Sequence, residues 1–163
     1  MSRNGPGVHL PPPLLYALVY TAGLGLDRLW PLPRLEGHGV KLMSDLLLVT
    51  SIGLGVWGLR SFARARTTIL PFRPSRSLIT TGPFRFTRNP LYLGLALAYA
   101  GIALGWGMLW PLLLLPAAVW IIARYVIRAE EAHLEAVFGE QYRAYRRRVR
   151  RWLGQRAASP PDR

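Results

Sequence analysis

The stretch LYLGLALAYAGIALGWGMLWPLLLLPAAVWIIA occupies residues 91–123 and contains no Asp, Glu, Lys, Arg or His. As one helix it would be about 50 Å long, whereas the hydrocarbon core of a bilayer is about 30 Å thick. The run is therefore expected to fold back on itself, and Gly105-Trp106-Gly107 is the natural break. We predict a hairpin of two membrane helices at 90–109 and 111–128, with Pro111 in the first turn of the second arm.

Two further apolar runs precede this hairpin and predict two more spans, at about 10–30 and 42–60. The first run is not followed by a cleavage site of small residues, so we expect it to remain as a helix and not to be removed as a signal peptide. The apolar fraction of 51% fits such a chain. The sequence therefore predicts an all-α, polytopic membrane protein with about four transmembrane helices.

The predicted spans divide the chain simply. One membrane domain is expected at 1–153, with a cytoplasmic loop at 60–89 and cytoplasmic amphipathic helices at 129–153. The last segment, 154–163, is polar and contains proline, and we predict that it is a disordered tail.

Arginine accounts for 20 of the 21 basic residues, and the formal net charge is +13. Seven arginines lie in the loop 60–89 and ten follow residue 123, whereas the turn at 105–111 has none. The positive-inside rule then places both termini and the loop in the cytoplasm. Anionic lipid headgroups are the expected partners of the excess positive charge on this side, and no nucleic-acid partner is predicted.

Several kinds of site are not supported by the sequence. The chain has no cysteine and only three dispersed histidines, so we predict no metal site. No catalytic serine triad or P-loop is present, and the glycine pairs follow no strand, which excludes a dinucleotide-binding fingerprint. We expect close packing between membrane helices at seven glycines: Gly23, Gly25, Gly53, Gly55, Gly58, Gly101 and Gly105.

Two short segments next to the hairpin could carry chemistry. Before it, Asn89 and Pro90 have the residue types of an N-cap and a first helical position. After it come Glu130 and Glu131, at the level of the lipid headgroups, where carboxylates are costly unless they are paired. One interpretation is an ion-pair lattice that joins Arg128 to Glu131.

A second interpretation follows from Glu135, because Glu131 and Glu135 form an unfavourable like-charge pair on one helix face. Such a cluster favours a cationic or hydroxyl-rich ligand.

The segment after the acids has the pattern of a basic amphipathic helix. Tyr142, Tyr145, Val149 and Trp152 recur on one face, and Gly139 can end the preceding helix as a left-handed cap. Arginines share the other face, and Arg151 is among them. A helix of this kind is expected to lie on an anionic membrane surface.

Taken together, GPFRFTRNPLYLG at 82–94 and EEAHLEAVFGEQYRAYRRRVRRW at 130–152, with a membrane hairpin between them, resemble the isoprenylcysteine carboxyl methyltransferase and phospholipid methyltransferase superfamily. The resemblance covers residues 67–153. Eukaryotic members usually have histidine where this chain has Asn89, whereas small bacterial relatives commonly have asparagine. The resemblance thus implies a small bacterial-type member, located in the inner membrane.

The resemblance implies an enzyme that binds S-adenosylmethionine at the cytoplasmic face and methylates a lipophilic substrate or lipid. Carried over by position, six residues would bind the cofactor: Arg88, Asn89, Tyr92, Gly94, Glu130 and Glu131. Arg128 and Arg146 are candidate catalytic residues that would orient an anionic substrate group. The methyl acceptor stays open between an isoprenylcysteine carboxylate, a phospholipid amine and other small acceptors, and the oligomeric state is not predicted.

Two alternatives remain at this point. Membrane sterol and enone reductases have a comparable arginine, proline, tyrosine and glycine stretch and an acidic C-terminal motif, but they use NADPH and normally need more spans. A non-catalytic membrane scaffold would instead use its basic helix to recruit anionic lipid or a partner. For the methyltransferase, Glu130→Ala is expected to abolish cofactor binding, and Arg151→Ala to change membrane affinity alone.

Overall fold

The computed structural model describes residues 11–65 and 77–155. The predictions that concern residues 1–10, 66–76 and 156–163 lie outside this part of the chain. The described residues confirm the all-α prediction, and their only β feature is an isolated bridge between Val149 and Gln155. The elements are α1 (Pro12–Leu29), α2 (His38–Arg64), η1 (Gly82–Arg85), α3 (Pro90–Gly105), α4 (Leu109–Ile121), η2 (Ile122–Ile127), α5 (Arg128–Phe138) and α6 (Glu140–Arg148).

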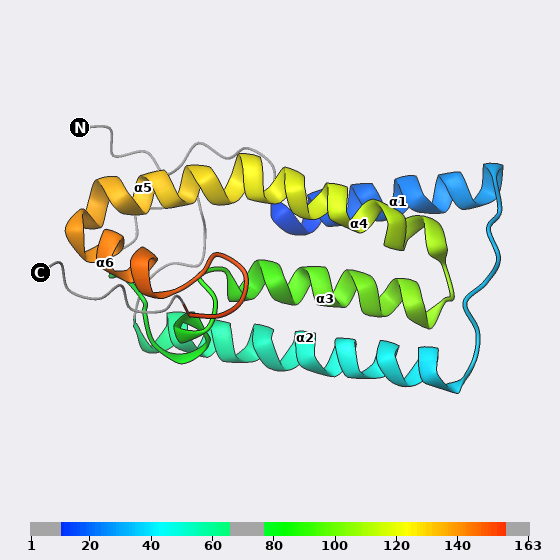
Figure 1. Ribbon diagram of the computed structural model, residues 1–163, viewed down its shortest axis with the longest axis horizontal. Coiled ribbons are helices and arrows are strands. Elements are labelled where there is room, and N and C mark those ends of the chain that lie inside the picture. Colours follow the sequence, from blue (N-terminus) through cyan, green and yellow to red (C-terminus); the bar gives the residue numbers. More distant parts are fainter. Residues whose placement is uncertain (1–10, 66–76, 156–163) are drawn as a thin grey trace, which may run out of the picture.

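The four longest apolar helices run side by side (Figure 1). Helix α2 packs along α3, and α1 packs along α4, while α3 and α4 join the two pairs. The connection between α1 and α2 and the turn between α3 and α4 lie at one end of this bundle. Helices α5 and α6 and the segment that precedes α3 lie at the other end.

The hairpin expected in residues 91–123 is present in α3 and α4, with its turn at residues 106–108. Gly107 has a φ of 65°, and a Cβ atom there would lie 2.6 Å from the carbonyl oxygen of Leu35. Only glycine fits this position without strain. The amide of Leu35 donates to the carbonyl oxygen of Gly107, so the turn is tied to the α1–α2 connection.

The second arm of the hairpin is longer than the sequence indicated. Helices α4, η2 and α5 form one continuous helix of 30 residues, Leu109–Phe138, so the helix continues past residue 128, where the predicted span ends. The segment after Pro116 contains no helix breaker before Gly139, which has a φ of 50° and ends the helix as predicted. The hydrogen-bond pattern widens to that of a π-helix at Ile122–Ile127, just before the charged residues of α5.

Two of the described helices are long and apolar enough to cross a membrane, namely His38–Arg64 and Leu109–Phe138. Helix α3 is apolar but has only 16 residues. On α2, large apolar side chains such as Leu46, Val49 and Ile52 are exposed, as expected for a surface in contact with lipid. Helix length and composition therefore support membrane helices in this chain.

Glycine and serine residues bring α2 and α3 close together. The Ser44 hydroxyl donates to the carbonyl oxygen of Gly101 at 2.8 Å, and the Ser51 hydroxyl donates to that of Gly94 at 2.9 Å. A Cβ atom on Gly101 would lie 2.9 Å from Leu48 Cγ, and one on Gly58 would lie 2.8 Å from Leu91 Cδ2. These contacts are the small-residue packing typical of membrane helices.

The prediction for the glycines holds at some positions and is wrong at others. Gly23 packs against Pro111, and Gly105 approaches Ser44. In contrast, a Cβ atom on Gly25, Gly53 or Gly55 would have no neighbour within 4 Å.

Gly101→Val is expected to destabilise the α2–α3 pair by about 1–3 kcal/mol, because its methyl groups would overlap Leu48 and the Ser44 carbonyl. Thermal unfolding of the detergent-purified protein measures this effect. Gly53→Val is the matched control, since Gly53 is also in the middle of a helix but has open space around it. Equal unfolding temperatures for the two variants would contradict the packing assigned to Gly101.

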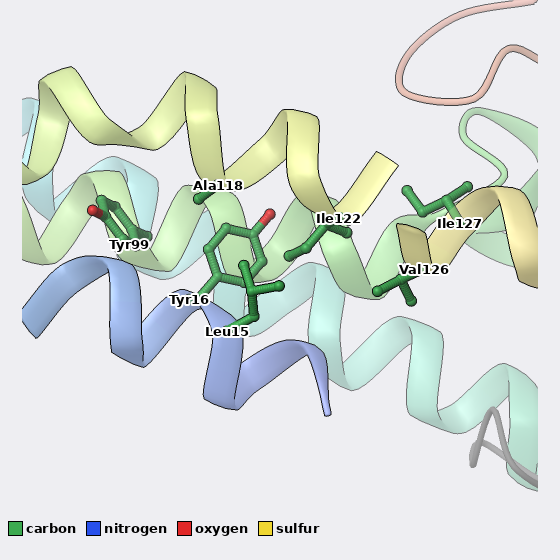
Figure 2. Packing of buried hydrophobic residues seen from close by; sticks show 7 residues of the cluster. All are labelled: Leu15, Tyr16, Tyr99, Ala118, Ile122, Val126 and Ile127. Carbon is green, nitrogen blue, oxygen red and sulfur yellow. The ribbon is translucent and has the colours of Figure 1, made fainter. Parts of the chain in front are cut away.

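The main hydrophobic core lies where α1 meets α3 and the long second arm of the hairpin. Figure 2 shows Tyr16 of α1 between Tyr99 of α3 and Ile122 of η2. Ala118, Ile122 and Ile127 are fully buried. Because this cluster extends through η2, it fixes the direction in which α5 leaves the bundle. The core thereby holds the start of α5 over the first turn of α3.

Candidate functional site

The two segments singled out from the sequence meet at one end of the bundle. Because α3 and the α4–α5 helix are antiparallel, the chain that leaves the first turn of α3 returns to the same level some 40 residues later. Tyr92 of α3 donates its hydroxyl to Glu130 Oε1 of α5 at 2.5 Å. The juxtaposition joins a phenol and a carboxylate that are 38 positions apart in sequence.

Burial changes the acidity of Glu130, which lies beyond the apolar stretch of the hairpin. Loss of solvent raises the pKa of Glu130 to about 7, and the hydrogen bond from Tyr92 only partly opposes the rise. The neighbouring charge of Glu131 raises it further. Glu130 therefore changes its charge near neutral pH.

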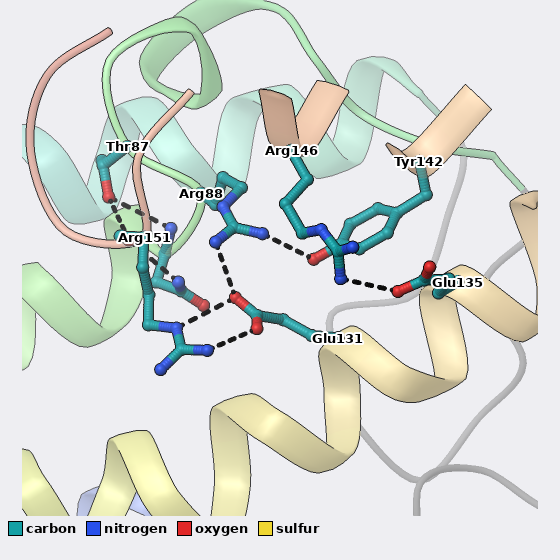
Figure 3. A network of polar contacts seen from close by, with 8 residues as sticks. Thr87, Arg88, Glu131, Glu135, Tyr142, Arg146 and Arg151 are labelled. Atoms are coloured by element: carbon teal, nitrogen blue, oxygen red, sulfur yellow. Dashed lines mark hydrogen bonds and ion pairs between the residues drawn. The ribbon is translucent and has the colours of Figure 1, made fainter. Parts of the chain in front are cut away.

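Glu131 is the centre of an ion-pair network (Figure 3). Arg151 donates from Nε and Nη2 to its two carboxylate oxygens, at 3.1 and 2.6 Å. Arg88 Nη2 lies 3.1 Å from Glu131 Oε1, and its Nη1 donates to the hydroxyl of Tyr142 at 3.1 Å. The side chains of Arg88 and Glu131 are only 6% and 12% exposed, so this pair is largely removed from solvent.

Main-chain contacts dock the segment after α6 onto the start of α3. The carbonyl oxygen of Arg151 accepts from the Thr87 hydroxyl at 3.1 Å and from Asn89 Nδ2 at 2.9 Å. The amide of Arg88 donates to the carbonyl oxygen of Arg150. Residues 150–151 are therefore fixed to residues 87–89 independently of the Arg151 side chain.

Aromatic side chains of α6 pack beside the network. Tyr142 and Tyr145 of α6 are buried with Phe84 of η1, and the Tyr145 hydroxyl donates to the carbonyl oxygen of Phe84 at 2.8 Å. Burial raises the pKa of Tyr142 to about 12, so its hydroxyl stays protonated. The protein itself covers this apolar face of α6, and the expectation that the helix lies on an anionic membrane surface stays a prediction.

The structure also corrects two local predictions. Asn89 precedes α3 as expected, but its side chain does not cap the helix, because its amide is bonded to Arg151. The ion pair predicted between Arg128 and Glu131 does not form, since Glu131 pairs with other arginines. Arg128 is exposed at the start of α5.

The repulsion expected within the acidic cluster is relieved by different arginines. Glu131 pairs with Arg88 and Arg151, whereas Glu135 accepts from Arg146 Nη1 at 2.7 Å. The like charges of Glu131 and Glu135 thus require no ligand to balance them.

Gly94 lies on the other side of α3 from this network. Its Cα faces α2, where an added Cβ atom would be 3.5 Å from the carbonyl oxygen of Ser51. The observed function of Gly94 is helix packing, and its contact with a cofactor stays a prediction. The structure thus brings together Arg88, Asn89, Tyr92, Glu130 and Glu131, with Gly94 behind them and Arg146 beside Glu135.

Arg151 is the residue that sequence reasoning misplaced. Helix α6 ends at Arg148, so Arg151 is in the following segment and not on the outer face of a helix. Its side chain binds Glu131, and the prediction of a purely surface position is therefore wrong. The one signal was its place in the second motif, three residues after the last turn of α6.

Comparison with known proteins identifies relatives of this chain. The family model described as phospholipid methyltransferase matches residues 40–141, which is more than half of the chain and includes Arg88, Tyr92, Glu130 and Glu131. An uncharacterised protein of Haemophilus influenzae is 35% identical over 63 residues, which cover 39% of this chain and 79% of that protein. No solved structure matches. The chain therefore belongs to the phospholipid methyltransferase family, whose members are membrane enzymes that use S-adenosylmethionine.

Proposed function

We propose that this enzyme binds S-adenosylmethionine at the cluster of Arg88, Tyr92, Glu130 and Glu131 and methylates the amine of a phospholipid headgroup. The observation that carries the proposal is the junction of the Tyr92–Glu130 hydrogen bond and the Arg88–Glu131 ion pair at one end of a bundle of apolar helices. Charged groups at the end of an apolar helix bundle, where the membrane would meet water, suit a polar cofactor and a substrate that arrives from the bilayer.

The chemistry of these side chains fits the cofactor. Arg88 Nε is buried and has no hydrogen-bond partner among the described residues, so a donor is available for the carboxylate of the cofactor. Glu130 accepts its hydrogen bond from Tyr92 through Oε1, which leaves Oε2 as an acceptor for an amino group or a ribose hydroxyl. When bound, S-adenosylmethionine supplies a methyl group activated by a sulfonium.

The other residues of the predicted site have supporting positions in this proposal. Asn89 fixes the start of α3 through its bond to Arg151, and Gly94 sets the distance between α3 and α2. Arg128 is exposed at the start of α5, where a phosphate can reach it. Arg146 is held by Glu135 near the network and would be a second group for an anionic substrate.

The proposed topology has four spans, formed by α1, α2, α3 and α4 with η2. Both termini and the end of the bundle with α5 and α6 face the cytoplasm, where the excess of arginine belongs. Exposed arginines of α6, such as Arg147 and Arg148, would contact anionic headgroups. The bacterial inner membrane is the proposed location.

The acceptor class is tested with purified protein, methyl-labelled S-adenosylmethionine and vesicles. We expect label to enter phosphatidylethanolamine and not phosphatidylglycerol, because only the former has an amine. Label in a prenylcysteine analogue alone would overturn the amine proposal while leaving the methyltransferase assignment intact. Binding of NADPH in place of adenosyl ligands would favour the reductase alternative, and binding of neither would favour the scaffold.

A further inference from the structure

We infer that Glu131 and Arg151 are positioning residues, which hold the guanidinium of Arg88 so that its Nε is the donor to the cofactor carboxylate. The inference rests on the proposed function and refines it. The family resemblance implied that Glu131 contacts the cofactor, whereas the network assigns it to the support of Arg88.

Glu131 has little capacity left for a ligand. Its two oxygens accept two N–H groups from Arg151, and Arg88 Nη2 forms an ion pair with Oε1 at 3.1 Å. A carboxylate offers about four lone-pair positions, and the bidentate pair with Arg151 already fixes the plane of the group. A ribose diol or an amino group would have to compete with these charged donors for the remaining position.

Arg88 shows the complementary pattern. Nη1 donates a hydrogen bond to Tyr142 and Nη2 forms an ion pair with Glu131, so both terminal nitrogens contact protein groups. Nε is buried without an acceptor among the described residues, and a buried donor without a partner costs free energy. An anionic group at Nε would satisfy this donor, which points to the cofactor carboxylate as the ligand of Arg88.

The contribution of the Arg151 side chain can be separated from that of its backbone. The carbonyl oxygens of Arg150 and Arg151 bind Thr87, Arg88 and Asn89 whatever side chain residue 151 carries. Replacement of the side chain therefore removes the bidentate pair with Glu131 and leaves the segment docked. A variant at this position reports on orientation and not on loss of the fold.

The test is calorimetric titration of the full-length, detergent-purified protein with two probes. S-adenosylhomocysteine contains the amino-acid carboxylate, whereas 5′-methylthioadenosine contains the ribose and adenine but no amino-acid part. We expect Arg151→Gln and Glu131→Gln each to lower the affinity for S-adenosylhomocysteine about 10-fold, which corresponds to the loss of one charged contact. The affinity for 5′-methylthioadenosine should stay unchanged. Arg151→Lys should retain an intermediate affinity, because an ammonium keeps the charge but not the bidentate geometry.

Arg147→Gln is the matched control, since Arg147 also pairs with a glutamate but is exposed on the outer face of α6. Its binding of both probes should equal that of the unaltered protein. If Glu131→Gln lowers the affinity for both probes equally, Glu131 contacts the ribose directly and the positioning role is wrong. If Arg151→Gln binds S-adenosylhomocysteine normally, the role of Arg151 is wrong while the cofactor site stands. If the unaltered protein binds neither probe, the proposed function itself fails and the inference with it.

Discussion

Glu130→Ala is expected to weaken the binding of S-adenosylhomocysteine by at least about 100-fold. The substitution removes the buried carboxylate of Glu130 that would contact the ligand, and it also leaves the Tyr92 hydroxyl without its acceptor. Loss of a buried charged partner typically costs 2–5 kcal/mol or more, and each 1.4 kcal/mol corresponds to a factor of about ten. Calorimetric titration of the purified protein measures this loss.

The pH dependence of binding provides an independent measurement on the same residue. Because the pKa of Glu130 is raised to about 7, its carboxylate is charged above that pH and neutral below it. The affinity for the cationic S-adenosylmethionine should therefore rise as the pH increases through about 7. In Glu130→Gln this rise should disappear, because the amide does not titrate.

Glu140→Ala is the control for both measurements. Glu140 is an acid on α6 that pairs with Arg143 and Arg147 at the surface and is not part of the buried cluster. Its loss should leave affinity and pH profile unchanged. Near-normal binding by Glu130→Ala would refute the assignment of this carboxylate to the cofactor site.

Arg88→Met is expected to abolish measurable cofactor binding and to lower stability by about 3 kcal/mol. Removal of one partner of a buried ion pair leaves an uncompensated charge, and the typical cost is about 3–5 kcal/mol. The lower end applies because Glu131 keeps its bidentate pair with Arg151. Tyr142 also loses the donor to its hydroxyl oxygen.

The stability effect is measured by thermal unfolding in detergent, with Arg147→Met as the exposed counterpart. Arg147 pairs with Glu140 at the surface, so its removal should change stability by no more than about 1 kcal/mol. Arg88→Lys separates charge from geometry, because lysine can keep one contact with Glu131 but cannot also reach Tyr142 in the same fork. If Arg88→Met unfolds at the same temperature as Arg147→Met, the buried ion-pair network does not stabilise the protein as described.

The sequence by itself determined the helical class, the hairpin and the two segments that form the site. The uncharged run at 91–123 is too long for one span, so its fold at Gly105-Trp106-Gly107 follows from bilayer thickness alone. An antiparallel hairpin then necessarily brings Arg88 and Glu130 to the same end. Through the family resemblance, the residue types at those positions implied S-adenosylmethionine as the cofactor, and the family match agrees with this assignment.

Only the tertiary structure decided how the charges are paired. Spacing along α5 favoured a pair between Arg128 and Glu131, but Glu131 is bound by Arg88 and Arg151, which come from two other segments. Sequence periodicity also extended the amphipathic helix through Arg151, whereas α6 ends at Arg148 and the chain turns back onto Asn89. Local patterns describe which face of a helix is apolar. They do not specify which distant segment covers that face, because partner choice depends on the packing of the whole bundle.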